Sequence, residues 1–213
     1  MNTIAIFGAT GRTGRRVVEK ALEAGFAVQA LVRDPARVAT RSEHLRLVGG
    51  DVLDADGVDR AVSGADHGVL SLFGHVKGSP PTLQTDGTRL VVEAMKRHGV
   101  TRLVTLSGGG LRAPEDRPGP VDHVMRLLLK TLAGQVLADA EGHLGVLKQS
   151  GLDWTVVRGP RLTDDPGRGQ GNYRVGYVGG GSSSSISRDD LADFILTQVD
   201  DLSYVGKMPF VSN

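Results

Sequence analysis

Short apolar runs alternate along most of the chain with stretches in which apolar residues recur every three or four positions. The runs are rich in β-branched residues and almost continuously apolar, as strands are when both faces of a parallel sheet are buried. This pattern predicts six buried strands. They cover Thr3–Phe7, Ala27–Val32 and residues 45–48, 68–73, 102–106 and 154–158.

The stretches between these runs predict helices. Residues 13–24 place Val17, Val18 and Ala21 on one face, and residues 85–98 repeat the pattern. These two stretches and a third, 141–150, are each followed by a glycine, which suits a left-handed helix cap. The alternation predicts an α/β fold: a single Rossmann-like domain over residues 1–213, with a doubly wound parallel sheet and helices on both faces.

Two segments interrupt the alternation and are expected to be insertions on the substrate side, near 108–138 and 164–185. The first is a loop rich in glycine and proline, 108–120, followed by a predicted helix at 121–136 with one wide apolar face. Core packing is the simpler interpretation of that face, and a substrate lid or a subunit interface is the alternative. The second contains a glycine-serine loop, and Ser187 then begins a predicted helix at 189–199.

Composition narrows the function classes. The 213 residues include 30 glycines, about twice the usual share, and no cysteine, which excludes disulfides and thiolate metal sites. A formal net charge of +1 gives no electrostatic reason to expect nucleic acid or an anionic membrane as a partner. The sequence has no signal-like or membrane-spanning apolar stretch, so we expect a cytoplasmic protein that acts on a small molecule. The oligomeric state stays open between monomer and homodimer.

The strongest motif is Gly-Ala-Thr-Gly-Arg-Thr-Gly, which follows the first strand and opens the first helix. Glycine allows a tight turn and a close approach of the backbone to a pyrophosphate, while the helix amides favour the anion. A P-loop is excluded because no Gly-Lys-Ser/Thr follows. The motif predicts a dinucleotide site. Its predicted contacts are Gly8, Thr10, Gly11, Arg12, Thr13 and Gly14.

The end of the second strand indicates which dinucleotide is preferred. An arginine at this position pairs with the 2′-phosphate of NADP, whereas an acid binds the ribose hydroxyls of NAD. Arg33 comes first here, and we expect Arg12 and Arg37 near the same phosphate. The sequence therefore favours NADP, and the adjacent Asp34 keeps NAD open.

The other strand ends carry further candidates. Asp51 follows the third strand, where an acid can meet the adenine amino group, and its alternative role is to cap a helix. Ser107 follows the fifth strand and is the candidate catalytic hydroxyl. Ligands of open α/β sheets bind beyond these carboxyl ends. The additional predicted cofactor contacts are Val52, Leu72, Phe73, Gly74, Ser107, Gly159, Pro160 and Arg161.

These motifs, together with Ser-Gly-Leu-Asp-Trp-Thr-Val-Val-Arg at 150–158, resemble the atypical short-chain dehydrogenase/reductases over nearly the whole chain. Within them the chain is most similar to the NAD(P)H-binding, NmrA-like group that includes the biliverdin-IXβ reductase/flavin reductases. The resemblance implies that NADPH lies across residues 8–14, Arg33 and Asp51, with its nicotinamide near Ser107 and residues 159–161. It also implies hydride transfer to flat acceptors such as flavins, tetrapyrroles or quinones.

One departure from the wider superfamily narrows the mechanism. Ordinary members use a Tyr-x-x-x-Lys pair for proton transfer. The three tyrosines here, Tyr173, Tyr177 and Tyr204, are followed four positions later by tyrosine, glycine and methionine. An epimerase- or dehydratase-like enzyme is therefore less favoured than an NADPH-dependent reductase. A non-catalytic NADP-binding redox sensor of the NmrA-like type remains the main alternative.

The six histidines provide no metal-binding spacing, so no metal site is predicted. His75 follows the fourth strand, and His143 lies in the helix before the sixth. We expect a structural or surface role for each histidine, and reach of the site is the alternative for these two.

Overall fold

The computed structural model describes residues 1–179 and 181–213. Within the helix α4 (Pro120–Leu132), the side chains of Val121, Met125, Arg126 and Leu129 lie outside the described residues, as does Gly180. The predictions of an apolar face at 121, 125 and 129 and of a loop at 180 fall on these positions.

An eight-stranded sheet forms the centre, in the order β3-β2-β1-β4-β5-β6-β10-β8. Neighbouring strands are parallel except β8 and β10, which are antiparallel. The order reverses between β1 and β4, and this is where open α/β sheets bind their ligands. The strands are β1 Thr3–Phe7, β2 Ala27–Val32, β3 Leu45–Gly49, β4 Gly68–Ser71, β5 Arg102–Gly108, β6 Asp153–Gly159, β8 Arg174–Gly176 and β10 Phe210–Ser212. The predicted doubly wound α/β fold is confirmed.

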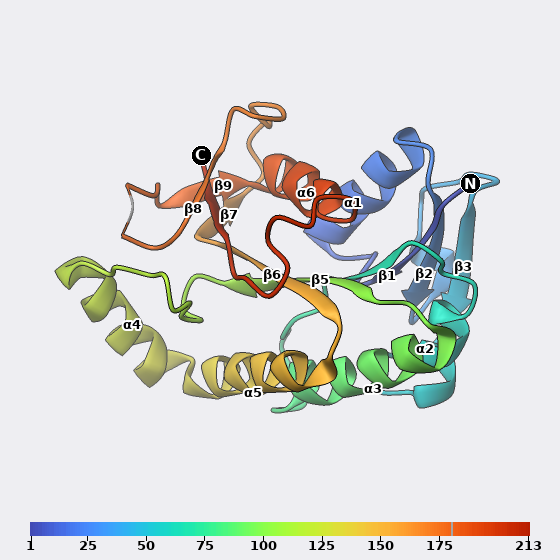
Figure 1. Cartoon of the computed structure of the whole chain (residues 1–213), viewed down its shortest axis with the longest axis horizontal. Helices are drawn as coiled ribbons and strands as arrows, with labels where there is room; N and C mark the ends of the chain where they lie inside the picture. Colours follow the sequence, from blue (N-terminus) through green and yellow to red (C-terminus); the bar gives the residue numbers. More distant parts are fainter. Residues whose placement is uncertain (180) are drawn as a thin grey trace.

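Helices cover both faces of the sheet (Figure 1). One face carries α1 (Arg12–Glu23) and α6 (Arg188–Thr197), which pack against each other. The other carries α2 (Ala55–Val62), α3 (Leu83–His98) and α5 (Gly134–Ser150). Each layer encloses its own apolar core, because the strands have buried side chains on both sides.

Several helix ends follow from single residues. Gly99 and Gly151 adopt φ of 71° and 74° just past α3 and α5, as the left-handed cap requires. The Ser187 hydroxyl accepts a hydrogen bond from the Asp190 amide at the start of α6. Asp54 caps α2, a helix that the periodicity analysis missed. The cap predicted as an alternative for Asp51 therefore belongs to Asp54 instead.

The two interrupting segments differ from their predicted form. The predicted helices 121–136 and 141–150 are wrong in extent, because α4 ends at Leu132, α5 begins at Gly134, and Ala133 separates them. A short 3-10 helix, η1 (Pro35–Arg37), follows β2. The second segment contains β8, and a separate parallel pair joins β7 (Arg161–Thr163) to β9 (Ser185–Ser187). Three-residue strands are too short to leave a periodic signal.

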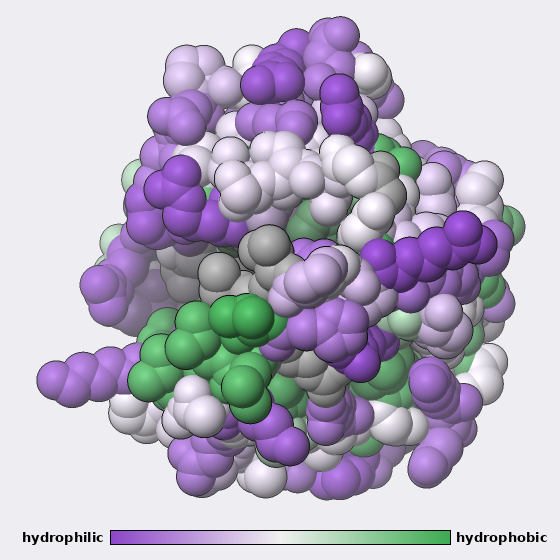
Figure 2. All heavy atoms as spheres, turned by 90° about the vertical axis from the view of Figure 1, so that its left-hand side faces the viewer, coloured by the Kyte–Doolittle hydropathy of each residue, from purple (hydrophilic) through white to green (hydrophobic). Residues whose placement is uncertain are grey.

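For the described side chains of α4, the expected core packing is also wrong. Val124, Leu127 and Leu132 are 61%, 64% and 84% exposed, and Leu128 is 48% exposed. α4 lies at the end of the molecule that faces the viewer in Figure 2, where hydrophobic side chains gather on the surface. None of the helices in the described part of the chain is both long and apolar enough to cross a membrane.

Candidate active site

The glycine motif forms a tight turn between β1 and α1. Gly8 has a φ of 82°, and its carbonyl accepts a hydrogen bond from the Gly11 amide at 3.0 Å. A Cβ on Gly14 would lie 2.1 Å from the Gly8 carbonyl oxygen, so only glycine allows the helix to start this close to the strand. The backbone therefore leaves a cradle at the carboxyl end of β1.

The first turn of α1 is open to an anion. No side chain caps its amides among the described residues, and no acidic residue lies in its first turn. By contrast, Asp54 and Ser187 cap α2 and α6. Unpaired amides at a helix N-terminus attract phosphate groups, so the residues present fit a pyrophosphate.

A cavity of about 850 Å³ lies beyond the ends of β4, β5 and β6. It adjoins the glycine turn, because a Cβ on Gly8 would lie only 2.8 Å from the backbone of Leu72 and Phe73, which line it. Residues from the loop after β5, from α5 and from the segment 182–184 complete its wall. Seven predicted site residues line it together: Leu72, Phe73, Gly74, Ser107, Gly159, Pro160 and Arg161.

The remaining predicted contacts lie outside the cavity lining. Arg33 and Arg37 are exposed after β2, and neither has an ion pair in the described part of the chain. The Asp34 carboxylate accepts a hydrogen bond from the Ala36 amide at 3.0 Å and caps η1. Asp51 similarly accepts one from the Leu53 amide at 3.0 Å, within a local turn. The free guanidinium groups and the engaged Asp34 agree with the NADP preference that the sequence predicts.

Arg12 lies at the start of α1 and forms an ion pair with Asp164, in the loop after β7. Asp164 also lies 3.1 Å from Arg188 and 3.4 Å from Arg16. One carboxylate thus meets three guanidinium groups beside the glycine turn, and the local charge stays positive.

The sequence analysis missed a buried ion pair that supports the cavity wall. Arg158 lies on β6 and is fully buried. Its two terminal guanidinium nitrogens each lie 2.8 Å from the Asp116 carboxylate. Asp116 also accepts hydrogen bonds from the amides of Ala113 and Val178. This arrangement fixes the loop after β5 against β6 and against the chain near 178. The signal in the sequence was an arginine inside an otherwise apolar strand, which requires a buried partner.

The charged state of Asp116 follows from these contacts. Burial raises its pKa, but the hydrogen bonds from Arg158 and the Ala113 amide, together with the positive charge, outweigh burial, and the pKa is lowered. The carboxylate is therefore ionised and accepts four hydrogen bonds at neutral pH.

A second carboxylate, Asp139 on α5, meets a histidine in the cavity wall. Nε2 of His75 lies 2.6 Å from the Asp139 carboxylate, whose side chain is fully buried. Asp139 also accepts hydrogen bonds from the amides of Gln84 and Thr85 at the start of α3. Burial raises the pKa of Asp139, yet the hydrogen bonds from Thr85, Gln84 and His75 outweigh it and lower the pKa.

His143 has a different environment. It is buried and does not line the cavity, so the structural role expected of it is confirmed and the alternative, that it reaches the site, is wrong. Its ring nitrogens lie 2.7 Å and 3.2 Å from the hydroxyls of Thr88 and Thr105. Burial lowers its pKa to about 4, despite the nearby charge of Asp139. His143 is therefore a neutral packing residue at physiological pH.

Comparison with known proteins agrees with this geometry. A protein-family profile described as NAD(P)H-binding matches residues 8–202. An uncharacterized chloroplastic protein of Arabidopsis thaliana is 29% identical over 198 residues, covering 89% of this chain and 69% of that protein. A 3-diazoavenalumate denitrifying reductase from a Streptomyces species is 35% identical over 126 residues, covering 54% of this chain but only 40% of the relative.

Among solved structures, ChuY of Escherichia coli O157:H7, described as an anaerobilin reductase, has a TM-score of 0.78 at 19% identity. The match covers 99% of this chain and 97% of that one. At this identity the likeness shows a shared fold.

Proposed function

Since the chain belongs to the NAD(P)H-binding family, we propose that it is an NADPH-dependent oxidoreductase that transfers hydride to a flat redox-active acceptor, such as a flavin, a quinone or a tetrapyrrole. The observation that carries this proposal is a cavity of about 850 Å³ that adjoins the glycine turn at Leu72 and Phe73. A dinucleotide held by the turn has room beside it for a second ligand.

The chemistry of the cavity wall supports a flat, largely apolar acceptor. Leu72, Phe73, Leu106, Leu111, Leu137 and Phe210 contribute apolar surface to it. Ala133 and Val136, which follow the exposed Leu132 at the end of α4, also line the cavity. The reductase names of the Streptomyces relative and of ChuY agree with this class of reaction.

Different residues of the chain would bind the cofactor, position the reactants and exclude water. The glycine turn and the amides of α1 would hold the pyrophosphate, and Arg33, with Arg37, would hold the 2′-phosphate. Ser107 would position the carboxamide of the nicotinamide or polarise the acceptor, and the apolar wall would exclude water. When bound, NADPH supplies the hydride.

The proposal is tested by NADPH oxidation in the presence of FMN, a benzoquinone or biliverdin, followed by the loss of the near-ultraviolet absorbance of NADPH. We expect steady, acceptor-dependent oxidation with at least one of the three. Tight NADPH binding without oxidation by any of them would overturn the enzyme assignment and favour a redox sensor.

Arg33→Ser is expected to raise the KM for NADPH about 10- to 100-fold, because charge-assisted hydrogen bonds to the 2′-phosphate are lost. The KM for NADH, which lacks that phosphate, should change little. Steady-state kinetics with both cofactors measure the difference. The matched control is Arg97→Ser on α3, which removes another exposed arginine, paired with Asp59 at 2.8 Å. An equal loss for NADPH and NADH in Arg33→Ser would contradict the assignment.

A further inference from the structure

The reductase reaction needs a proton as well as a hydride. The acceptor and NADPH take up one proton to give the reduced acceptor and NADP⁺. The two electrons travel with the hydride, so the proton must come from a separate donor. The Tyr-x-x-x-Lys pair is absent from the sequence, and none of the three tyrosines lines the cavity. The donor must therefore be another group at the cavity wall or water.

We propose that His75 is the proton donor of this reaction and that Asp139 is its positioning residue. This inference rests on the proposed function. His75 lines the same cavity as Ser107, and its side chain is 13% exposed. An imidazole is the side chain whose ordinary pKa allows proton transfer near neutral pH. In the reductive step an N–H bond of the imidazolium breaks, the proton goes to the reduced acceptor, and water restores it to the ring.

The contacts of Asp139 explain how the ring is held. Its two carboxylate oxygens accept hydrogen bonds from the amides of Gln84 and Thr85 and from the Thr85 hydroxyl, so the start of α3 fixes the carboxylate. The ring Nε2 of His75 lies 2.6 Å from the same carboxylate. A buried, ionised acceptor at this distance selects the tautomer and the orientation of the ring.

The cavity wall carries other charged groups besides His75. They are Arg112, Asp116, Asp122 and Arg161. Asp139 is the titratable group that contacts the ring in the described part of the chain. His143 titrates near pH 4, so a change in rate near neutral pH does not originate from it.

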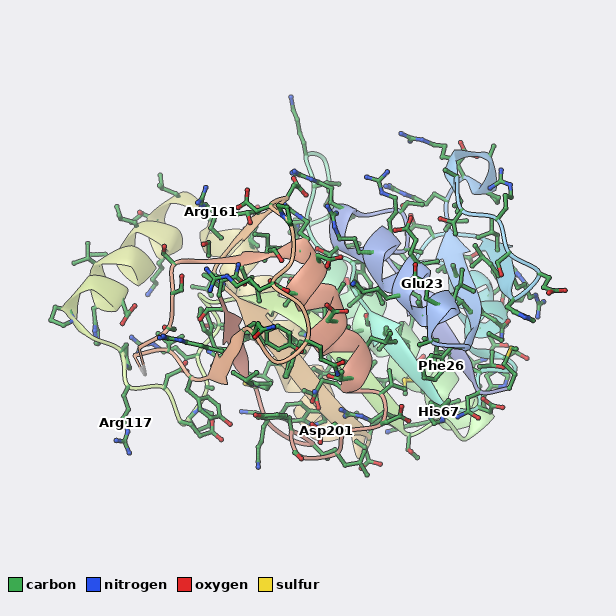
Figure 3. All side chains as sticks on the ribbon, turned by 90° about the horizontal axis from the view of Figure 1, so that it is seen from above. Glu23, Phe26, His67, Arg117, Arg161 and Asp201 are labelled. Atoms are coloured by element: carbon green, nitrogen blue, oxygen red, sulfur yellow. The ribbon has the colours of Figure 1, made fainter. Side chains whose placement is uncertain are left out.

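The test compares His75→Gln with His67→Gln. Glutamine can still donate a hydrogen bond to Asp139, but it cannot deliver a proton. His67 is a matched control, because its Nε2 also lies 2.6 Å from a carboxylate, that of Asp200. It lies beside Phe26 and far from Arg161 of the cavity (Figure 3).

For His75→Gln we expect kcat with the working acceptor to fall about 100-fold or more, with the KM for NADPH unchanged. The wild-type rate should fall as pH rises, because the donor must carry its proton, and this alkaline limb of the profile should vanish in the variant. His67→Gln should retain both the rate and the limb. An independent readout is the ¹⁵N chemical shift of the His75 ring, which should show Nε2–H hydrogen-bonded to Asp139 in the wild-type protein.

The outcomes separate the two proposals. Turnover that survives His75→Gln with an unchanged pH profile overturns the donor role and leaves the reductase assignment intact. A wild-type protein that binds NADPH but reduces no acceptor overturns both.

Discussion

Gly14→Ala is expected to weaken NADPH binding at least 100-fold and to lower the free energy of unfolding by about 1–3 kcal/mol. The new Cβ would lie 2.1 Å from the Gly8 carbonyl oxygen and 2.9 Å from its carbon. Both are backbone atoms, so α1 must move away from β1. The displaced amides then no longer point at the pyrophosphate position, which is why binding should fall more steeply than stability. Fluorescence titration with NADPH and urea unfolding measure the two effects.

Gly145→Ala is the matched control for this substitution. Gly145 lies inside α5, where an added Cβ would meet nothing within 4 Å. Alanine there should leave NADPH binding unchanged and raise the free energy of unfolding by about 0.5–1 kcal/mol, because alanine is the better helix former. Unaltered NADPH affinity in Gly14→Ala would mean that the dinucleotide does not bind at this turn.

The sequence predicted the six central strands because most of them are nearly continuous apolar runs, and such runs need no tertiary information to be recognised. It also placed the glycine turn, since the required backbone geometry is local. Elements that depend on distant partners were missed. The strand β8 exists only because β10 pairs with it, and α2 is short enough that its cap, Asp54, is its main signal.

The residues of the candidate site were likewise predicted where the signal is local and missed where it is not. Ser107 and Arg161 were predicted because they follow the ends of predicted strands, and the parallel strands β1 to β6 bring their carboxyl ends to one edge. The pairs Arg158–Asp116 and His75–Asp139 join residues 42 and 64 positions apart. No local pattern links such residues. The exposure of α4 was not predictable either, because an amphipathic helix has the same pattern whether its apolar face meets a core or the surface.

The second large effect concerns the buried ion pair between Arg158 and Asp116. Asp116→Asn should lower the free energy of unfolding by about 3–5 kcal/mol, because it leaves the fully buried Arg158 guanidinium without its counter-charge. Asp59→Asn is the control: Asp59 pairs with Arg97 at a partly exposed site, where an ion pair contributes at most about 1 kcal/mol. Urea unfolding measures both, and similar losses in the two variants would contradict the assigned role.

The lowered pKa of Asp116 predicts how the stability that this pair contributes changes with pH. The pKa of Asp116 is lowered in the folded protein, so the unfolded chain binds the proton more readily at acid pH. The pair therefore stabilises the fold above the ordinary carboxyl pKa of about 4, and this contribution is lost as pH falls through the lowered folded value. In Asp116→Asn the loss of stability that this pair causes at acid pH should disappear.

Because Asp116 also lines the cavity and holds the loop after β5, its loss should disturb the acceptor side of the site. The glycine turn, whose hydrogen bonds lie within residues 8–15, should keep its affinity for NADPH.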